Sequence, residues 1–185
     1  MVQIIDFPAD DTEIIHQAAV MLVEGFKDHS PNAWPDVDAA LEEVQESLEA
    51  GRINRIAMDD NGTVLGWVGA TTQYNGNAWE LHPMVVQLEH QGKGIGRALV
   101  ADLEVQISKQ GGITIYLGTD DEDGMTSLGN TDLYPHVVEH IVNIRNLGRH
   151  PYEFYQKLGY VIVGVIPDAN GLGKPDIIMA KRVGR

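Results

Sequence analysis

The feature of this sequence that most limits its possible folds is the segment Trp79–Leu99, WELHPMVVQLEHQGKGIGRAL. Apolar and β-branched residues predict a strand over residues 79–86. Glu80 and His82 are two residues apart, so their side chains lie on the same side of that strand. Pro83 has no N–H group, and we therefore expect it to interrupt the hydrogen-bond ladder and open the strand in a bulge.

A glycine-rich loop, Gln91-Gly92-Lys93-Gly94-Ile95-Gly96, follows this strand, and a helix starts inside it. Unsatisfied N–H groups at a helix start, with no Cβ in the way, form a seat for phosphate oxygens. A dinucleotide fingerprint would need glycine where Arg97 stands, and a Walker loop would need Ser or Thr after Lys93. The alternative interpretation is a tight strand–helix turn that binds nothing.

The composition narrows the classes of protein and partner. With 185 residues, 43% hydrophobic content and no cysteine, the chain fits one globular domain over residues 1–185, without disulfides or thiol catalysis. A net charge of −14 argues against nucleic acid or an anionic membrane as a partner; it suits a cationic substrate, and solubility alone is the alternative explanation. The sequence has no apolar run of about 18 residues and no signal-peptide pattern, so we expect a cytoplasmic protein.

Apolar periodicity and turn residues predict the remaining elements. Asp10 or Asp11 is expected to cap a helix over residues 12–26, and Asp36 a second helix over residues 37–48. Four residues of the second helix lie largely off its apolar stripe and are expected to form a solvated face: Glu42, Glu43, Glu46 and Glu49. The other expected elements are strands over 2–7, 55–58, 63–72, 113–118, 161–166 and 176–180, and helices over 95–109, within 132–147 and over 150–159.

An acidic run, Asp120 to Asp123, lies in the loop that follows the strand over 113–118. It lacks the alternate-residue spacing and the distal Glu of a calcium-binding EF-hand. A solvated loop is one interpretation. A rim that attracts cations is the other, and the position beyond the carboxyl end of a central strand favours it.

The order of elements, β-α-α-β-β-β-α-β-α-β-β, and two signatures resemble the GCN5-related N-acetyltransferases. The signatures are Gln-x-x-Gly-x-Gly at residues 91–96 and EFYQKLGY at residues 153–160. The resemblance implies an α/β fold, with a mixed, mostly antiparallel sheet that contains a central, parallel, splayed strand pair and is flanked by helices. It also implies acetyl-coenzyme A as co-substrate, and no metal.

Four further segments, at residues 80–86, 111–121, 150–155 and 174–177, resemble one branch of that family, the aminoglycoside 6'-N-acetyltransferases, in their small, chromosomal, dimeric form. This resemblance covers roughly residues 70–181. It implies acetyl transfer to the 6'-amine of an aminoglycoside by direct attack in a ternary complex, and a homodimer.

Such a reaction assigns roles to the backbone around the bulge. We expect the Met84 N–H to bind the thioester carbonyl, and the N–H groups of Val85 and Val86 to hold the pantetheine arm. The pyrophosphate would then lie on Gln91, Gly92, Lys93, Gly94, Ile95, Gly96 and Arg97.

Three side chains are candidates for proton transfer. Glu80 would collect the ammonium proton; alternatively it pairs with the substrate cation or with a neighbouring strand residue. His82 would share that relay or be structural. Tyr155 would protonate the leaving thiolate, because a phenol titrates near pH ~10. The alternative for Tyr155 is packing beside Phe154 and Leu158, which we expect to fill the buried face of their helix.

The acceptor would be framed by aromatic rings and bound by acids, namely Trp34, Tyr74, Trp79, Glu80, Asp120 and Asp123. Polyamines or basic protein amines are alternative acceptors on the same fold. A non-catalytic acyl-coenzyme A sensor is an alternative of another class, and it predicts binding without turnover. The seven histidines lack the spacing of metal ligands.

Overall fold

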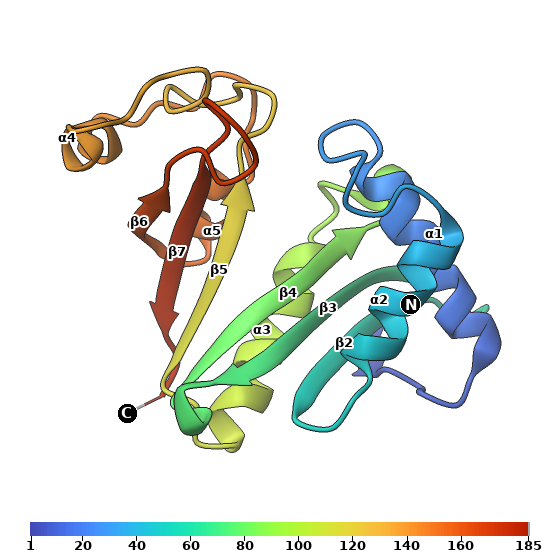
Figure 1. The fold of residues 1–185 in the computed structure, drawn as a ribbon. Coiled ribbons are helices and arrows are strands. Elements are labelled where there is room, and N and C mark those ends of the chain that lie inside the picture. The colour runs from blue at the N-terminus through green and yellow to red at the C-terminus, as the bar shows by residue number, and fades with distance from the viewer. Residues whose placement is uncertain (185) are drawn as a thin grey trace. The chain divides into compact units, whose positions relative to one another are not determined.

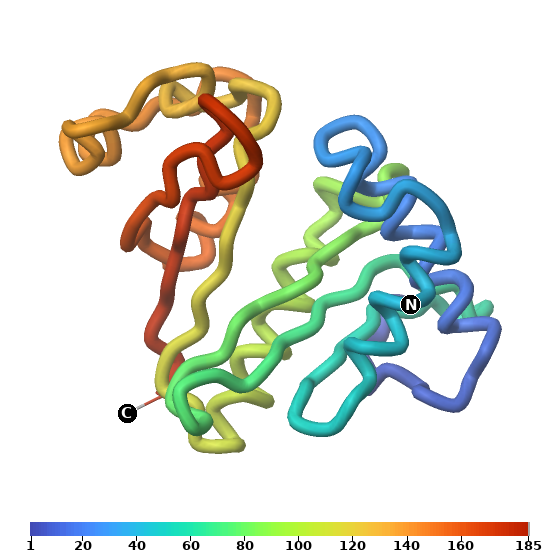
Figure 2. The backbone as a smooth tube through the Cα atoms, in the orientation of Figure 1, coloured from blue at the N-terminus to red at the C-terminus, as the bar shows by residue number. Residues whose placement is uncertain are grey.

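The computed structural model describes residues 1–184 and divides into two compact units (Figures 1 and 2). The first unit holds Met1–Ile115 and the C-terminal residues from Val183 onward, and the second holds Tyr116–Arg182. The chain leaves and re-enters the first unit beside Ile113, whose carbonyl accepts hydrogen bonds from the amides of Val183 and Gly184 at 2.8 and 3.2 Å.

The first unit is a four-stranded antiparallel meander with three helices. Its strands follow the order β1-β2-β3-β4, and β5 starts beside β4, where the Asn77 carbonyl accepts from the Ile113 and Thr114 amides. The elements are β1 (Gln3–Asp6), α1 (Thr12–Phe26), α2 (Val37–Ser47), β2 (Arg52–Met58), β3 (Val64–Gln73), β4 (Ala78–Val86) and α3 (Ile95–Lys109), with short 3-10 turns η1 (Tyr74–Gly76) and η2 (Leu88–His90).

Helices cover both faces of this meander (Figure 1). Trp67 of β3 and its cross-strand partner Val85 of β4 belong to the core that α1 and α2 bury. Side chains alternate between the faces of a strand, so the next residue, Gly66, faces α3. A Cβ at Gly66 would lie 2.9 Å from Leu99 Cδ1, which explains the glycine at this close approach.

Two aspartates start the first two helices, as the sequence predicts. Asp11, and not Asp10, caps α1: its Oδ1 accepts from the Glu13 and Ile14 amides at 3.0 and 3.2 Å. Asp36 Oδ1 accepts from the Ala39 amide at 2.9 Å. Each side chain satisfies N–H groups that a helix start leaves without partners.

A charged side chain ties the sheet to α3. Arg55 of β2 is buried, and its Nε donates to Asp102 Oδ2 of α3 at 2.5 Å, while its Nη1 donates to Asp6 Oδ1 of β1. A buried charge without a partner would cost several kcal/mol, so these carboxylates keep the guanidinium compatible with the interior.

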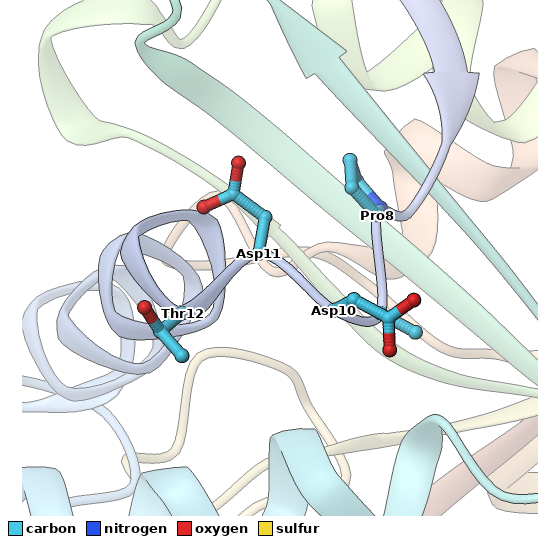
Figure 3. Close-up of a pocket in the computed structure, with 5 residues that line it drawn as sticks. Pro8, Asp10, Asp11 and Thr12 are labelled. Carbon is cyan, nitrogen blue, oxygen red and sulfur yellow. The ribbon is translucent and has the colours of Figure 1, made fainter.

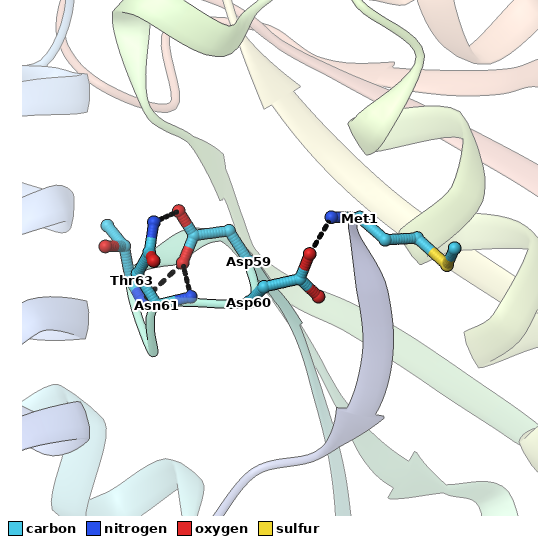
Figure 4. Close-up of polar contacts among 5 residues, drawn as sticks. All are labelled: Met1, Asp59, Asp60, Asn61 and Thr63. Carbon is cyan, nitrogen blue, oxygen red and sulfur yellow. Dashed lines mark hydrogen bonds and ion pairs between the residues drawn. The ribbon is translucent and has the colours of Figure 1, made fainter.

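The turn between β2 and β3 is organised by one carboxylate (Figure 4). Asp59 Oδ1 accepts from the Asn61 and Thr63 amides at 2.8 and 2.9 Å, and these bonds lower the pKa of Asp59 below its usual value. The neighbouring Asp60 forms an ion pair with the N-terminal ammonium of Met1.

The second unit contains β5 (Thr114–Asp120) from Tyr116 onward, together with α4 (Val137–Val142), α5 (Tyr152–Lys157), β6 (Val161–Ile166) and β7 (Asp176–Arg182), in the strand order β5-β7-β6. The start of α5 is fixed by His150, which is buried. His150 Nδ1 accepts from the Tyr152 amide at 3.2 Å, so Nε2 carries the proton and donates to the Asp120 carbonyl at 2.9 Å.

The predicted elements are all present, with small shifts at their ends, and the two helices predicted between β5 and β6 are α4 and α5. One prediction about packing is wrong. On α5, Tyr152 and Tyr155 are buried, whereas Phe154 and Leu158 are only partly covered. Within residues 1–184, no helix combines the length and the apolar character needed to cross a membrane.

Candidate functional site

A bulge in β4 shapes the candidate site, as Pro83 predicts. Val68 pairs with Met84 and Ala70 pairs with Leu81, so two residues of β4 oppose the single residue Gly69. These two are His82 and Pro83, joined by a cis peptide bond. A Cβ at Gly69 would lie 2.6 Å from the His82 carbonyl oxygen, and so the bulge requires a glycine on β3.

The bulge leaves polar side chains on one side of β4. Trp79 and Leu81 are buried, whereas Glu80 is half-buried and His82 is exposed, so the two polar residues share a side as expected. The Glu80 carboxylate accepts from Gln73 Nε2 of β3 at 3.4 Å. This contact corresponds to pairing with a neighbouring strand residue; the role of Glu80 as a base stays a prediction.

His82 contacts a carboxylate that we expected to be solvated. Its Nε2 lies 3.6 Å from Glu43 Oε1 of α2, and its ring is 5.9 Å from that of Trp34. The prediction of a solvated face holds for Glu42, Glu46 and Glu49 and is wrong for Glu43. Glu43 follows Ala40 by three residues and precedes Ser47 by four, and both of these residues are buried. Helix periodicity therefore places Glu43 next to the apolar stripe, and this position in the sequence could have indicated that Glu43 is partly buried.

The glycine loop leads into α3 as predicted. Gly94 is the N-cap residue of α3 in the left-handed region, and Gly92 also has a positive φ. Within residues 1–184, a Cβ at either glycine would meet nothing within 4 Å, and no side chain caps the helix. The first amides of α3 therefore face an open space suited to an anion. Gln91 Nε2 donates to the Val86 carbonyl at 3.2 Å and ties the loop to the end of β4.

Tyr155 belongs to the second unit. Its ring is 5.0 Å from that of Phe154 and 5.7 Å from that of Tyr160, and burial raises the pKa of its phenol well above the usual value. The phenol is therefore held in its protonated form at neutral pH. Packing, the alternative interpretation, is observed; donation of a proton to a thiolate stays a prediction.

The acidic run is not a uniform rim. Asp121 is 1% exposed, and its carboxylate accepts from the Met125 amide and from the amide and hydroxyl of Thr126 at 2.6 to 2.8 Å. Glu122 lies 3.6 Å from Lys174 Nζ. Within residues 1–184, no group of three or more His, Cys, Asp or Glu side chains could hold a metal ion.

The exposed members of the run are Asp120 and Asp123, the two that we predicted to bind an acceptor. Asp120 Oδ1 accepts from Asn170 Nδ2 at 2.5 Å.

Of the predicted aromatic residues, Tyr74 is exposed in η1, whereas Trp79 is buried against Gly112. The structure thus shows a packing role for Trp79, and its contact with an acceptor stays a prediction.

Predicted residues are divided between the units. Trp34, Tyr74, Trp79, Glu80, His82 and the stretch from Met84 to Arg97 lie in the first unit, and Asp120, Asp123 and Tyr155 lie in the second. The structure brings Trp34 and His82 together around Glu43. The pocket in Figure 3 is separate from all of them: it is lined by Pro8, Ala9, Asp10, Asp11 and Thr12.

The chain matches the model of the Acetyltransferase (GNAT) family over residues 19–129. It is 44% identical to a solved aminoglycoside 6'-N-acetyltransferase complexed with coenzyme A, over 98% of this chain and 97% of that chain, with a TM-score of 0.89. The aminoglycoside 6'-N-acetyltransferase from Enterococcus faecium is also 44% identical over 98% and 97% of the two chains, with a TM-score of 0.88. Curated protein sequences give no match.

An aminoglycoside 6'-acetyltransferase of type Ii is 38% identical over 98% of this chain and 97% of that chain, with a TM-score of 0.76. The expected fold class is confirmed: the described residues form a mixed sheet of seven strands, with β4 and β5 as the parallel pair, flanked by helices.

Proposed function

Since the chain belongs to the acetyltransferase (GNAT) family, we propose that it transfers acetyl from acetyl-coenzyme A to the 6'-amino group of aminoglycosides. The observation that carries the proposal is 44% identity, over 98% of the chain, to an aminoglycoside 6'-N-acetyltransferase. The net charge of −14 supports it, because aminoglycosides are polycations.

The backbone after the bulge and the glycine loop would hold the co-substrate. Acetyl-coenzyme A supplies the acetyl group as a thioester. The open space at Gly92 and Gly94 fits its pyrophosphate, with Gln91, Lys93, Ile95, Gly96 and Arg97 completing the loop. The amides of Met84, Val85 and Val86 would bind the thioester carbonyl and the pantetheine arm.

Proton transfer would be divided between the units. Glu80, half-buried beside the bulge, takes the proton of the attacking amine directly or through water, with His82 on the same side of β4. Tyr155, protonated at neutral pH, donates to the leaving thiolate. A single acetyltransferase domain over residues 1–185 belongs to the proposal, and the family match over residues 19–129 includes residues of each unit.

The acceptor would lie against Trp34, Tyr74 and Trp79, with its ammonium groups on Glu80, Asp120 and Asp123.

A homodimer belongs to the proposal too. The last strand of the sheet, β6, exposes Val161 and Val163, with 61% and 59% of their surfaces open to solvent. An apolar edge strand is a surface that a second copy would cover. We also propose that the protein acts in the cytoplasm, where acetyl-coenzyme A is available. The expected outcome of the reaction is antibiotic resistance.

The test is a thiol-release assay with acetyl-coenzyme A and either kanamycin or its 6'-hydroxy counterpart. We expect turnover with the 6'-amine and none with the 6'-hydroxyl, because only the amine is a competent nucleophile for this site. Turnover with spermine or a basic peptide, but not with kanamycin, would overturn the acceptor and leave an acetyltransferase. Binding of acetyl-coenzyme A without turnover of any amine would favour the acyl-coenzyme A sensor.

A further inference from the structure

We propose that Glu43 is a positioning residue for the acceptor: its carboxylate holds the His82 ring and the Trp34 indole in the orientation that receives the aminoglycoside. The inference rests on the proposed function, and it adds a residue of α2 to that site. Glu43 itself need not touch the substrate, because it would act through the side chains of His82 and Trp34.

Three side chains from three parts of the first unit meet at this carboxylate. His82 Nε2 of β4 lies 3.6 Å from Glu43 Oε1, and the Ser47 hydroxyl of α2 donates to the same oxygen at 3.2 Å. Trp34, in the loop between α1 and α2, lies close enough to contribute to the lowered pKa of Glu43. The carboxylate therefore connects β4 to the loop before α2.

The carboxylate is held in its charged form. The His82 contact lowers the pKa of Glu43 below its usual value, with help from Ser47 and Trp34, although burial acts in the opposite direction. Only 19% of the Glu43 side chain is exposed, so its position is more restricted than that of a solvated glutamate. Hydrogen bonds to a carboxylate are about twice as strong as those between neutral groups, and the one from the Ser47 hydroxyl fixes the Glu43 carboxylate beside the two rings.

The two rings that Glu43 orders differ in exposure and in support. Trp34 packs edge-on against Phe26 at the end of α1, with ring centres 4.7 Å apart, and its own ring is 5.9 Å from His82. The His82 side chain is 54% exposed and remains accessible beside Trp34. An aromatic face next to an imidazole, both fixed from behind by a negative charge, suits the binding of a cationic sugar ring.

The experiment compares Glu43→Gln with Glu46→Gln. Both variants remove one negative charge from α2, but Glu46 is exposed to solvent, whereas Glu43 is only partly exposed. We expect Glu43→Gln to raise the KM for kanamycin about tenfold, with kcat and the KM for acetyl-coenzyme A changed less than threefold. Glu46→Gln should behave as the wild type. Equal kinetics of the two variants would overturn the inference and leave the proposed function intact.

A double-mutant cycle with His82→Gln separates positioning from general destabilisation. If Glu43 acts through His82, the double variant should lose no more kanamycin affinity than the weaker-binding single variant. Multiplying losses would show that Glu43 acts independently of His82, which contradicts the inference.

An arm without catalysis keeps the inference testable if the wild type proves inactive towards kanamycin. The indole N–H signal of Trp34, identified by its loss in Trp34→Phe, is followed in ¹H–¹⁵N spectra of the full chain. It should shift in Glu43→Gln and not in Glu46→Gln. An unmoved signal would show that Glu43 does not hold Trp34, whatever the acceptor is.

Discussion

Glu43 in the first unit and Asp121 in the second are both carboxylates removed from solvent, but their partners differ in kind. Asp121 binds the amides of Met125 and Thr126, which lie within five residues of it in sequence. Glu43 instead contacts His82 of a distant strand, whose ring lies beside Trp34 of another loop. A carboxylate whose hydrogen bonds all come from its own loop serves to fold that loop, whereas one that contacts an exposed ring on another element can position a ligand.

The largest effect that would test this contrast is expected from Asp121→Ala. The change leaves two amides and a hydroxyl without their acceptor in a buried loop, so we expect a loss of about 3 kcal/mol in the free energy of unfolding. Urea titration measures it. Asp123→Ala, an exposed neighbour, is the control and should change stability by less than about 0.5 kcal/mol. A loss below about 1 kcal/mol for Asp121→Ala would contradict the structural role.

Glu80→Ala tests a third carboxylate, which has a chemical role in the proposal. General-base catalysis contributes about 10²-fold or more, so turnover of kanamycin should fall by roughly that factor, while affinity for acetyl-coenzyme A changes little. Rates measured from pH 6 to 9 serve as the check, with Gln73→Ala as a control that removes only the contact between Glu80 and β3. Equal turnover of Glu80→Ala and the wild type across this range would exclude Glu80 as the base.

The smallest expected effect is the pH dependence of the free energy of unfolding that Glu43 contributes. The pKa of Glu43 is lowered in the folded state, so its carboxylate contributes stability that is fully present above the ordinary value of 4.5 and lost as the pH falls through the folded value. The stability difference between wild type and Glu43→Gln should therefore be larger at pH 6 than at pH 3, as measured by urea unfolding. Glu46→Gln is the matched control for the loss of one negative charge from α2. A constant difference for Glu43→Gln would mean that its contacts do not favour the charged form.

Local sequence features were predictable because their causes are local. An aspartate that precedes an apolar periodicity caps a helix, as Asp11 and Asp36 do, and a proline inside a strand interrupts its ladder, as Pro83 does. The glycine loop was recognisable for the same reason: its positive φ angles are set by Gly92 and Gly94 themselves.

Features that depend on distant partners were not predictable in the same way. Glu43 lies beside an apolar stripe, but only the fold brings His82 of β4 to it. On α5, which has six residues, the pairs 152/155 and 154/158 are equally compatible with a helix, and tertiary packing buries the first pair. In the sequence, Asp121 is one of four successive acidic residues, and nothing distinguishes it from its neighbours. Its hydrogen bonds form only when the loop folds around its carboxylate.

The contact of Val183 and Gly184 with Ile113 has a consequence for how this chain can diversify. The second unit enters and leaves through one point, so it is a closed loop of about 70 residues anchored at both ends. The entropy of closing a flexible loop grows only with the logarithm of its length, and even doubling it costs about 0.6 kcal/mol. Insertions in the surface turns between Tyr116 and Arg182 are therefore cheap for the first unit, and these turns can vary in length while the glycine loop and the β4 bulge stay as they are.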